Sequence, residues 1–182
     1  MGSSAEEAAR ALREIAEIKA RAAGFQDYRA ESGQLLLWGF AYFIGFALSA
    51  VFPQYILLVW VLVVVFGLLA GSAIARRTNP DIPGIAWRYL ALIGSILLLC
   101  ILIHIVMWPL SAEQGSMLAP LFVSTLYILR GVQLRPRYLV IGALLAILSL
   151  SGFLWLSAWF WGWMAFACGG TLMVSGLWLR NY

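Results

Sequence analysis

Residues 35–75 read LLLWGFAYFIGFALSAVFPQYILLVWVLVVVFGLLAGSAIA and contain no charged side chain. Only Pro53-Gln54 interrupts this stretch, so it divides into two apolar runs, residues 35–52 and 55–75. At about 1.5 Å per helical residue, runs of this length reach roughly 27–31 Å, which matches a hydrocarbon core of about 30 Å. The stretch therefore predicts two membrane-spanning helices joined by a very short turn.

Four further apolar runs follow along the chain, at residues 89–110, 117–129, 138–156 and 158–179. The run at 117–129 is the weakest, because it is short, carries Pro120 near its start and ends against Arg130. By length alone it also fits a re-entrant or interfacial segment. Hydropathy alone therefore does not decide whether this fourth run crosses the membrane.

Composition places the whole chain in lipid. Apolar residues make up 63% and charged residues 11% of the 182 residues. A soluble domain carries about 45–50% apolar and about 25% charged residues. A fold in water has no means of covering so much apolar surface, whereas a bilayer solvates it. We therefore expect an integral membrane protein whose first partner is the lipid bilayer.

The basic residues predict the number and direction of the spans. If all six runs cross and the N-terminus is inside, the inside segments are 1–34, 76–88, 130–137 and 180–182. These segments hold all 12 Lys and Arg residues, and the outside turns hold none. Because basic residues collect on the cytoplasmic side of membrane proteins, six spans with both termini cytoplasmic are predicted. The same distribution accounts for the net charge of +4, so no nucleic-acid binding is expected.

The predicted fold is all-α: a polytopic membrane protein with six transmembrane helices in three hairpins at residues 35–182. A cytosolic segment, residues 1–34, precedes this bundle. Within it we predict an amphipathic N-terminal helix at residues 4–23, because Ser4 and Glu7 fit a capping box and opposite charges recur four residues apart. Its narrow apolar stripe fits three roles: packing on the loops of its own bundle, pairing with a partner helix, or resting on the membrane surface.

Small residues recur four apart on three of the predicted spans. The stripes are Ala41, Gly45 and Ser49; Gly67, Gly71 and Ala75; and Ala167, Thr171 and Ser175. Small side chains let helices approach closely in lipid, so each stripe predicts a packing seam. Seams inside one bundle and seams between protomers of a homo-oligomer both remain open.

The predicted spans contain no Asp, Glu, Lys or Arg, which weighs against a proton-coupled pump or a carboxylate-based enzyme. His104 is their one histidine, and Cys100 and Met107 share its helical face. Such side chains suit soft metals, but Cys and Met are also common apolar filler. These three are the weakest of metal candidates, and no metal or cofactor is predicted.

A serine–histidine pair is the second chemical reading. Ser149 and Ser151, followed by Gly152, lie at a depth similar to that of His104. Six spans with such a serine resemble the intramembrane serine proteases. The Gly-x-Ser-Gly motif of that family is not present, and its histidine belongs on the last span, where this sequence has none. A nucleophile also needs its base within hydrogen-bond reach. No catalytic residue is therefore predicted.

The final third resembles a known group of proteins. Residues 126–131, LYILRG, lead through a basic turn to an apolar helix, and WMA at 163–165 and GG at 169–170 precede GLWLR at 176–180. With the charged N-terminal helix, residues 117–182 resemble small uncharacterised six-span bacterial membrane proteins often encoded beside winged-helix transcription regulators. The resemblance implies a bacterial inner-membrane location and partnership with a cytosolic regulator. It carries over no catalytic residue.

Two functions are consistent with these observations. In the first, the protein is a non-enzymatic sensor, scaffold or accessory subunit that docks a cytosolic protein through residues 1–31 and the basic loops. In the second, it is a small transporter or binder of an apolar or neutral ligand, with a pocket near His104, Trp108 and Met164.

Overall fold

A computed structural model of the chain describes residues 12, 28–78, 83–133 and 136–181, and every regular element among them is helical. The helices are α2 (Tyr28–Val51), α3 (Ile56–Thr78), α4 (Ile85–Val106), α5 (Ala112–Gln133), α6 (Pro136–Trp155), α7 (Phe160–Met164) and α8 (Thr171–Arg180). A π-helical segment, η3 (Ala165–Gly170), joins α7 to α8. Single 3₁₀ turns, η1 (Pro53–Tyr55) and η2 (Ser157–Trp159), precede α3 and α7. The predicted N-terminal helix at 4–23 lies outside the described residues, apart from helical Leu12.

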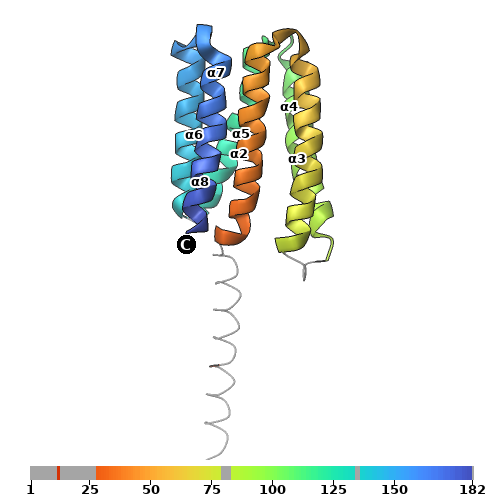
Figure 1. Ribbon diagram of the computed structural model, residues 1–182, viewed down its shortest axis with the longest axis vertical. Helices are drawn as coiled ribbons and strands as arrows, with labels where there is room; N and C mark the ends of the chain where they lie inside the picture. Colours follow the sequence, from red (N-terminus) through yellow and green to blue (C-terminus); the bar gives the residue numbers. More distant parts are fainter. Residues whose placement is uncertain (1–11, 13–27, 79–82, 134–135, 182) are drawn as a thin grey trace, which may run out of the picture.

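Six helical segments in the described chain are long and apolar enough to cross a membrane. The prediction of an all-helical bundle with six candidate spans is therefore confirmed. The helices stand side by side, and consecutive spans run in opposite directions (Figure 1). We call the end that holds the described arginines the charged end; they are Arg76, Arg77, Arg88, Arg130, Arg137 and Arg180.

The fourth span is longer than its apolar run. α5 has 22 residues, whereas residues 117–129 alone were expected to cross. It begins at Ala112 because Ser111 and Gln114 form a capping box: the Ser111 N–H donates to Gln114 Oε1 at 2.9 Å, and the Gln114 N–H donates to Ser111 Oγ at 3.2 Å. This reciprocal pair satisfies backbone donors at the helix start, so the polar first turn is helical. Pro120 lies inside the helix and is buried.

Helix boundaries differ from the apolar runs elsewhere for local reasons. α4 spans Ile85–Val106 rather than 89–110, because it starts after Gly84, whose φ of 72° is left-handed, and ends before Pro109. α2 starts at Tyr28, ahead of the predicted boundary at residue 35. As a result, Glu31 lies on the first spanning helix, and His104 lies in the last turn of α4.

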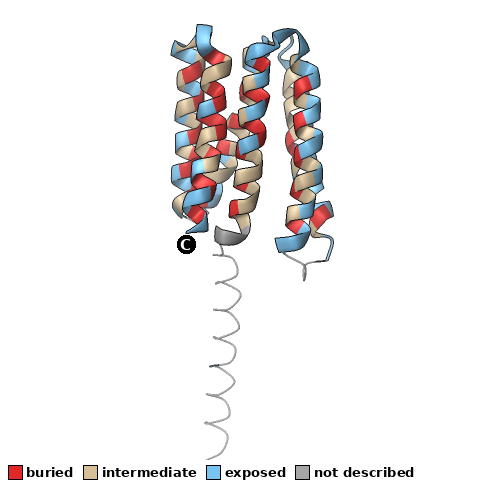
Figure 2. Ribbon diagram, in the orientation of Figure 1, coloured by how far each residue is buried: buried red, intermediate tan, exposed pale blue. Residues whose placement is uncertain are grey.

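The core lies between α2, α5, α6 and the last span (Figure 2). Its largest fully buried side chains include Phe46, Tyr138 and Phe160. The α3–α4 pair is attached at the side, and α4 buries only Ala86 and Ile96 among its described residues. Of the 18-residue apolar stretch in each span, 50% is buried in the last span but only 6% in α4. Most of the α4 surface is therefore available to lipid.

Packing partners do not simply follow chain neighbours. α5 packs extensively along α6, but α2 packs along α8 as well as α3. The predicted arrangement in three hairpins thus stays a prediction, because the closest associations cross it. In lipid, packing depends on close fit rather than on hydrophobic contrast, so distant segments pair wherever their surfaces match.

Candidate functional site

A cluster of polar side chains at the charged end joins three helices. Glu31 of α2 accepts hydrogen bonds from the Arg130 guanidinium of α5 and from the Tyr138 hydroxyl of α6. Tyr138 is completely buried, whereas the side chains of Glu31 and Arg130 are 26% and 44% exposed. One carboxylate therefore satisfies a buried hydroxyl and neutralises a half-exposed cation. We call Glu31, Arg130 and Tyr138 the interhelical clamp.

Aromatic rings pack against the residues of the clamp. Tyr127 stacks on Tyr138 with ring centroids 5.4 Å apart and planes inclined by 13°. The Arg130 guanidinium lies over the Tyr138 ring, 5.4 Å from the ring centroid. Such a cation–π contact favours the same Arg130 position as the ion pair does. Because both carboxylate oxygens already accept hydrogen bonds, the geometry suits holding helices together better than proton transfer.

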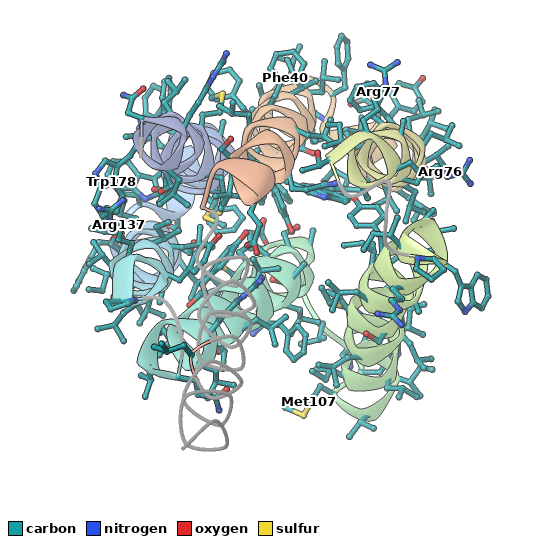
Figure 3. All side chains as sticks on the ribbon, turned by 90° about the horizontal axis from the view of Figure 1, so that it is seen from below. Phe40, Arg76, Arg77, Met107, Arg137 and Trp178 are labelled. Atoms are coloured by element: carbon teal, nitrogen blue, oxygen red, sulfur yellow. The ribbon has the colours of Figure 1, made fainter. Side chains whose placement is uncertain are left out.

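A second cationic contact lies beside the clamp. The Arg137 guanidinium at the start of α6 sits 5.6 Å from the ring centroid of Trp178 on α8. Figure 3, which looks along the bundle from the charged end, shows these two residues next to each other, on the opposite side from Arg76 and Arg77. The charged end therefore has one side where arginines contact neighbouring helices and another where they point outward.

A polar seam connects α2 to the α3–α4 pair. Trp38 Nε1 donates to the Tyr89 hydroxyl at 2.9 Å, and that hydroxyl donates to the Gly67 carbonyl at 3.1 Å. Gln34 Nε2 donates to the Gly71 carbonyl at 2.7 Å. These bonds satisfy the side-chain donors of Gln34, Trp38 and Tyr89, which lipid would leave unpaired, and they anchor α3 and α4 to α2.

The glycines of α3 make this seam possible. A Cβ at Gly71 would lie 1.9 Å from the Tyr89 hydroxyl oxygen, and one at Gly67 would lie 2.6 Å from the Trp38 ring. The stripe of small residues on α3 therefore faces its own bundle. For this stripe, the structure selects the seam within one bundle over the seam between protomers.

The centre of the bundle is closed. Between the described helices, a small space at the middle is lined by Tyr42, Pro120, Val123, Leu145, Cys168 and Leu172, and it has no room for a water molecule. The π-helical segment contributes Cys168, whose Sγ lies 3.3 Å from the Oγ of Ser149. Both side chains are buried. Among the described residues this is a packed contact rather than a ligand site.

The structure brings together only part of the predicted ligand pocket. The rings of His104 and Trp108 contact each other with centroids 5.6 Å apart. Met164 is fully buried in the main core cluster, which includes neither of them. Trp108 is 71% exposed, so it faces outward rather than into an enclosed space. The pocket stays a prediction without a described cavity to hold it.

The remaining candidates also separate. Cys100 and His104 share α4, but Met107 lies beyond the helix end, as its C-cap, and is exposed. No group of three His, Cys, Asp or Glu side chains gathers anywhere in the described chain. The Ser151 hydroxyl donates to the carbonyl of Leu148 on its own helix. In the described contacts, the serines at 149 and 151 are therefore bonded to groups other than His104.

Sequence reasoning missed the interhelical clamp, because it assigned Glu31 to a cytosolic segment and Arg130 to a loop. The two residues are 99 positions apart, so no local pattern links them. One signal was present: Arg130 directly follows an apolar run and Glu31 lies four residues before one, and charged residues near the ends of spans can pair across helices. No protein-family model, curated protein or solved structure matches this chain.

Proposed function

We propose that this protein is a non-enzymatic sensor, scaffold or accessory subunit of a membrane, with a docking face for a cytosolic protein at its charged end. The observation that carries the proposal is the separation of charge from the apolar bundle. All described arginines lie at one end, and the small space lined by the described core residues has no room even for a water molecule. Polar groups able to recognise a soluble partner therefore occur where the helices leave the membrane.

The closed centre supports a scaffold over a transporter. A carrier of an apolar or neutral ligand needs a binding space among its helices, and such sites usually bury most of the ligand. The small space at the centre of the described core has no room even for a water molecule. The interhelical clamp also holds the start of α2 against α5 and α6. A docking segment that precedes α2 would therefore be attached to a firmly held helix.

The proposal includes a location and an orientation. We infer a multi-pass protein of the bacterial inner membrane, with three hairpins and with both termini in the cytoplasm. The support is the positive-inside distribution of all 12 basic residues, together with the resemblance to six-span proteins encoded beside winged-helix regulators. Residues 1–27, which precede α2, would then provide an amphipathic docking helix, and such a regulator is the expected partner.

Affinity capture from native membranes tests this function. The intact protein is expected to retain one specific cytosolic partner, and deletion of residues 2–27 is expected to release it. This deletion keeps Glu31, so the clamp remains intact and loss of the partner reports docking rather than unfolding. Glu31→Gln in the full-length chain is the matched control and should keep the partner. Equal capture by the full-length and deleted proteins would contradict the proposal.

A further inference from the structure

The outward side of the charged end carries unpaired positive charge. Arg76 and Arg77 in the last turn of α3 and Arg88 in the first turn of α4 are exposed. None of the three makes an ion pair or hydrogen bond through its side chain within the described residues, in contrast to Arg130. Neither α3 nor α4 contains an acidic residue, and the short connection between them adds only Asp81 by sequence. A net positive patch therefore marks this end of the pair.

Exposed apolar side chains continue from this patch along the helices. On α4 they are bulky: Leu92, Leu98, Ile101, Leu102, Ile105 and Val106. Helix interfaces in membranes favour small residues, whereas long branched side chains suit contact with acyl chains. Trp87, beside Arg88, is 74% exposed, and an exposed tryptophan at a helix end is typical of the headgroup level. Apolar surface, tryptophan and arginines thus follow one another in the order in which a lipid presents acyl chain and headgroup.

We propose that the α3–α4 pair binds an anionic diacyl phospholipid, with the phosphate against Arg76, Arg77 and Arg88 and the acyl chains along the outer face of α4. A zwitterionic lipid offers the same chains but no net charge, so the arginines provide the preference. Guanidinium groups suit phosphate because they donate paired hydrogen bonds to its oxygens. This inference does not depend on the cytosolic partner, whose docking helix the proposed function places at residues 1–27.

Native mass spectrometry of the full-length protein tests the proposal. The protein is purified from mixed micelles containing equal amounts of palmitoyl-oleoyl phosphatidylglycerol and phosphatidylcholine, and the lipids it retains are counted. The wild type is expected to prefer phosphatidylglycerol. The triple variant Arg76→Gln/Arg77→Gln/Arg88→Gln should lose about 100-fold of this preference, since each of the three basic residues near a headgroup contributes about fivefold. The matched variant with lysine at all three positions keeps the charge and should keep most of the preference.

A salt series on the wild type remains informative even if the glutamine variant does not fold. Because exposed charges are screened, the preference for phosphatidylglycerol should fall steadily as ionic strength rises. Equal retention of the two lipids by the wild type would overturn the proposal. An undiminished preference in the folded glutamine variant would do the same, because it would place the anionic lipid elsewhere. So would arginine-dependent binding of an acidic cytosolic protein without any lipid preference.

Discussion

Replacement of Gly142 by alanine adds one methyl group at a site where α5 and α6 approach each other closely. A Cβ at this position would lie 2.6 Å from the Ser124 carbonyl oxygen and 2.8 Å from both the Ile128 backbone nitrogen and its Cγ1. Ordinary van der Waals contact begins at 3.4 Å. Two of these three atoms belong to the backbone of α5, so no side-chain rotation relieves the overlap. The two helices must instead move apart.

The expected cost follows from overpacking. An extra methyl group in a well-packed site costs about 1–3 kcal/mol. Alanine also favours the helix over glycine by at most about 1 kcal/mol, which opposes part of this cost. Gly94→Ala is the matched control, because a Cβ at Gly94 in the middle of α4 meets nothing within 4 Å. We expect Gly142→Ala to be less stable than Gly94→Ala by about 1–3 kcal/mol, since only the control keeps the helix gain without overlap.

Unfolding of both variants in mixed micelles, with increasing sodium dodecyl sulfate and tryptophan fluorescence as the signal, measures this difference. Gly142→Ala should unfold at a lower detergent fraction than the wild type, and Gly94→Ala at the same or a higher one. If the two variants unfold together, the close approach of α5 and α6 at Gly142 is refuted. The fluorescence of the folded state should be unchanged in the control, which confirms that the native packing is intact.

Three shorter predictions concern the clamp, the cap of α5 and the seam. Glu31→Ala leaves the buried Tyr138 hydroxyl without its acceptor and should cost about 1–3 kcal/mol in the same unfolding assay, and less when combined with Tyr138→Phe. Additive costs would argue against the bond. Ser111→Ala removes a capping side chain and should cost about 0.5–2 kcal/mol, whereas Ser111→Asn should restore most of it. Gly71→Ala should be clearly destabilising in the wild type but nearly neutral in a Tyr89→Ala background, because its clash is with Tyr89; an equal cost in both backgrounds would locate the close contact elsewhere.

Much of the fold follows from the sequence read locally. A bilayer requires about 20 consecutive apolar residues with every backbone group bonded inside the segment, so span number follows from run length and flanking charge. The structure confirms six candidate spans, including the doubtful fourth. The length of α5 was also within reach, because the Ser-x-x-Gln pattern at 111–114 is a local capping signal. Hydropathy alone does not indicate this first turn, because its residues are polar.

The facing of each helix was decided by the tertiary structure alone. In water, a helix shows its buried face as an apolar stripe, but in lipid the whole circumference is apolar, so the pattern does not distinguish neighbour from solvent. The α3 glycines predicted a packing seam but not which helix packs there. Only the structure shows that Gly71 lies against Tyr89. Likewise, Glu31 and Arg130 meet only because α2 and α5 pack in the same bundle. Composition and charge therefore predict a membrane protein with six candidate spans, whereas close fit between helices determines which side chains meet.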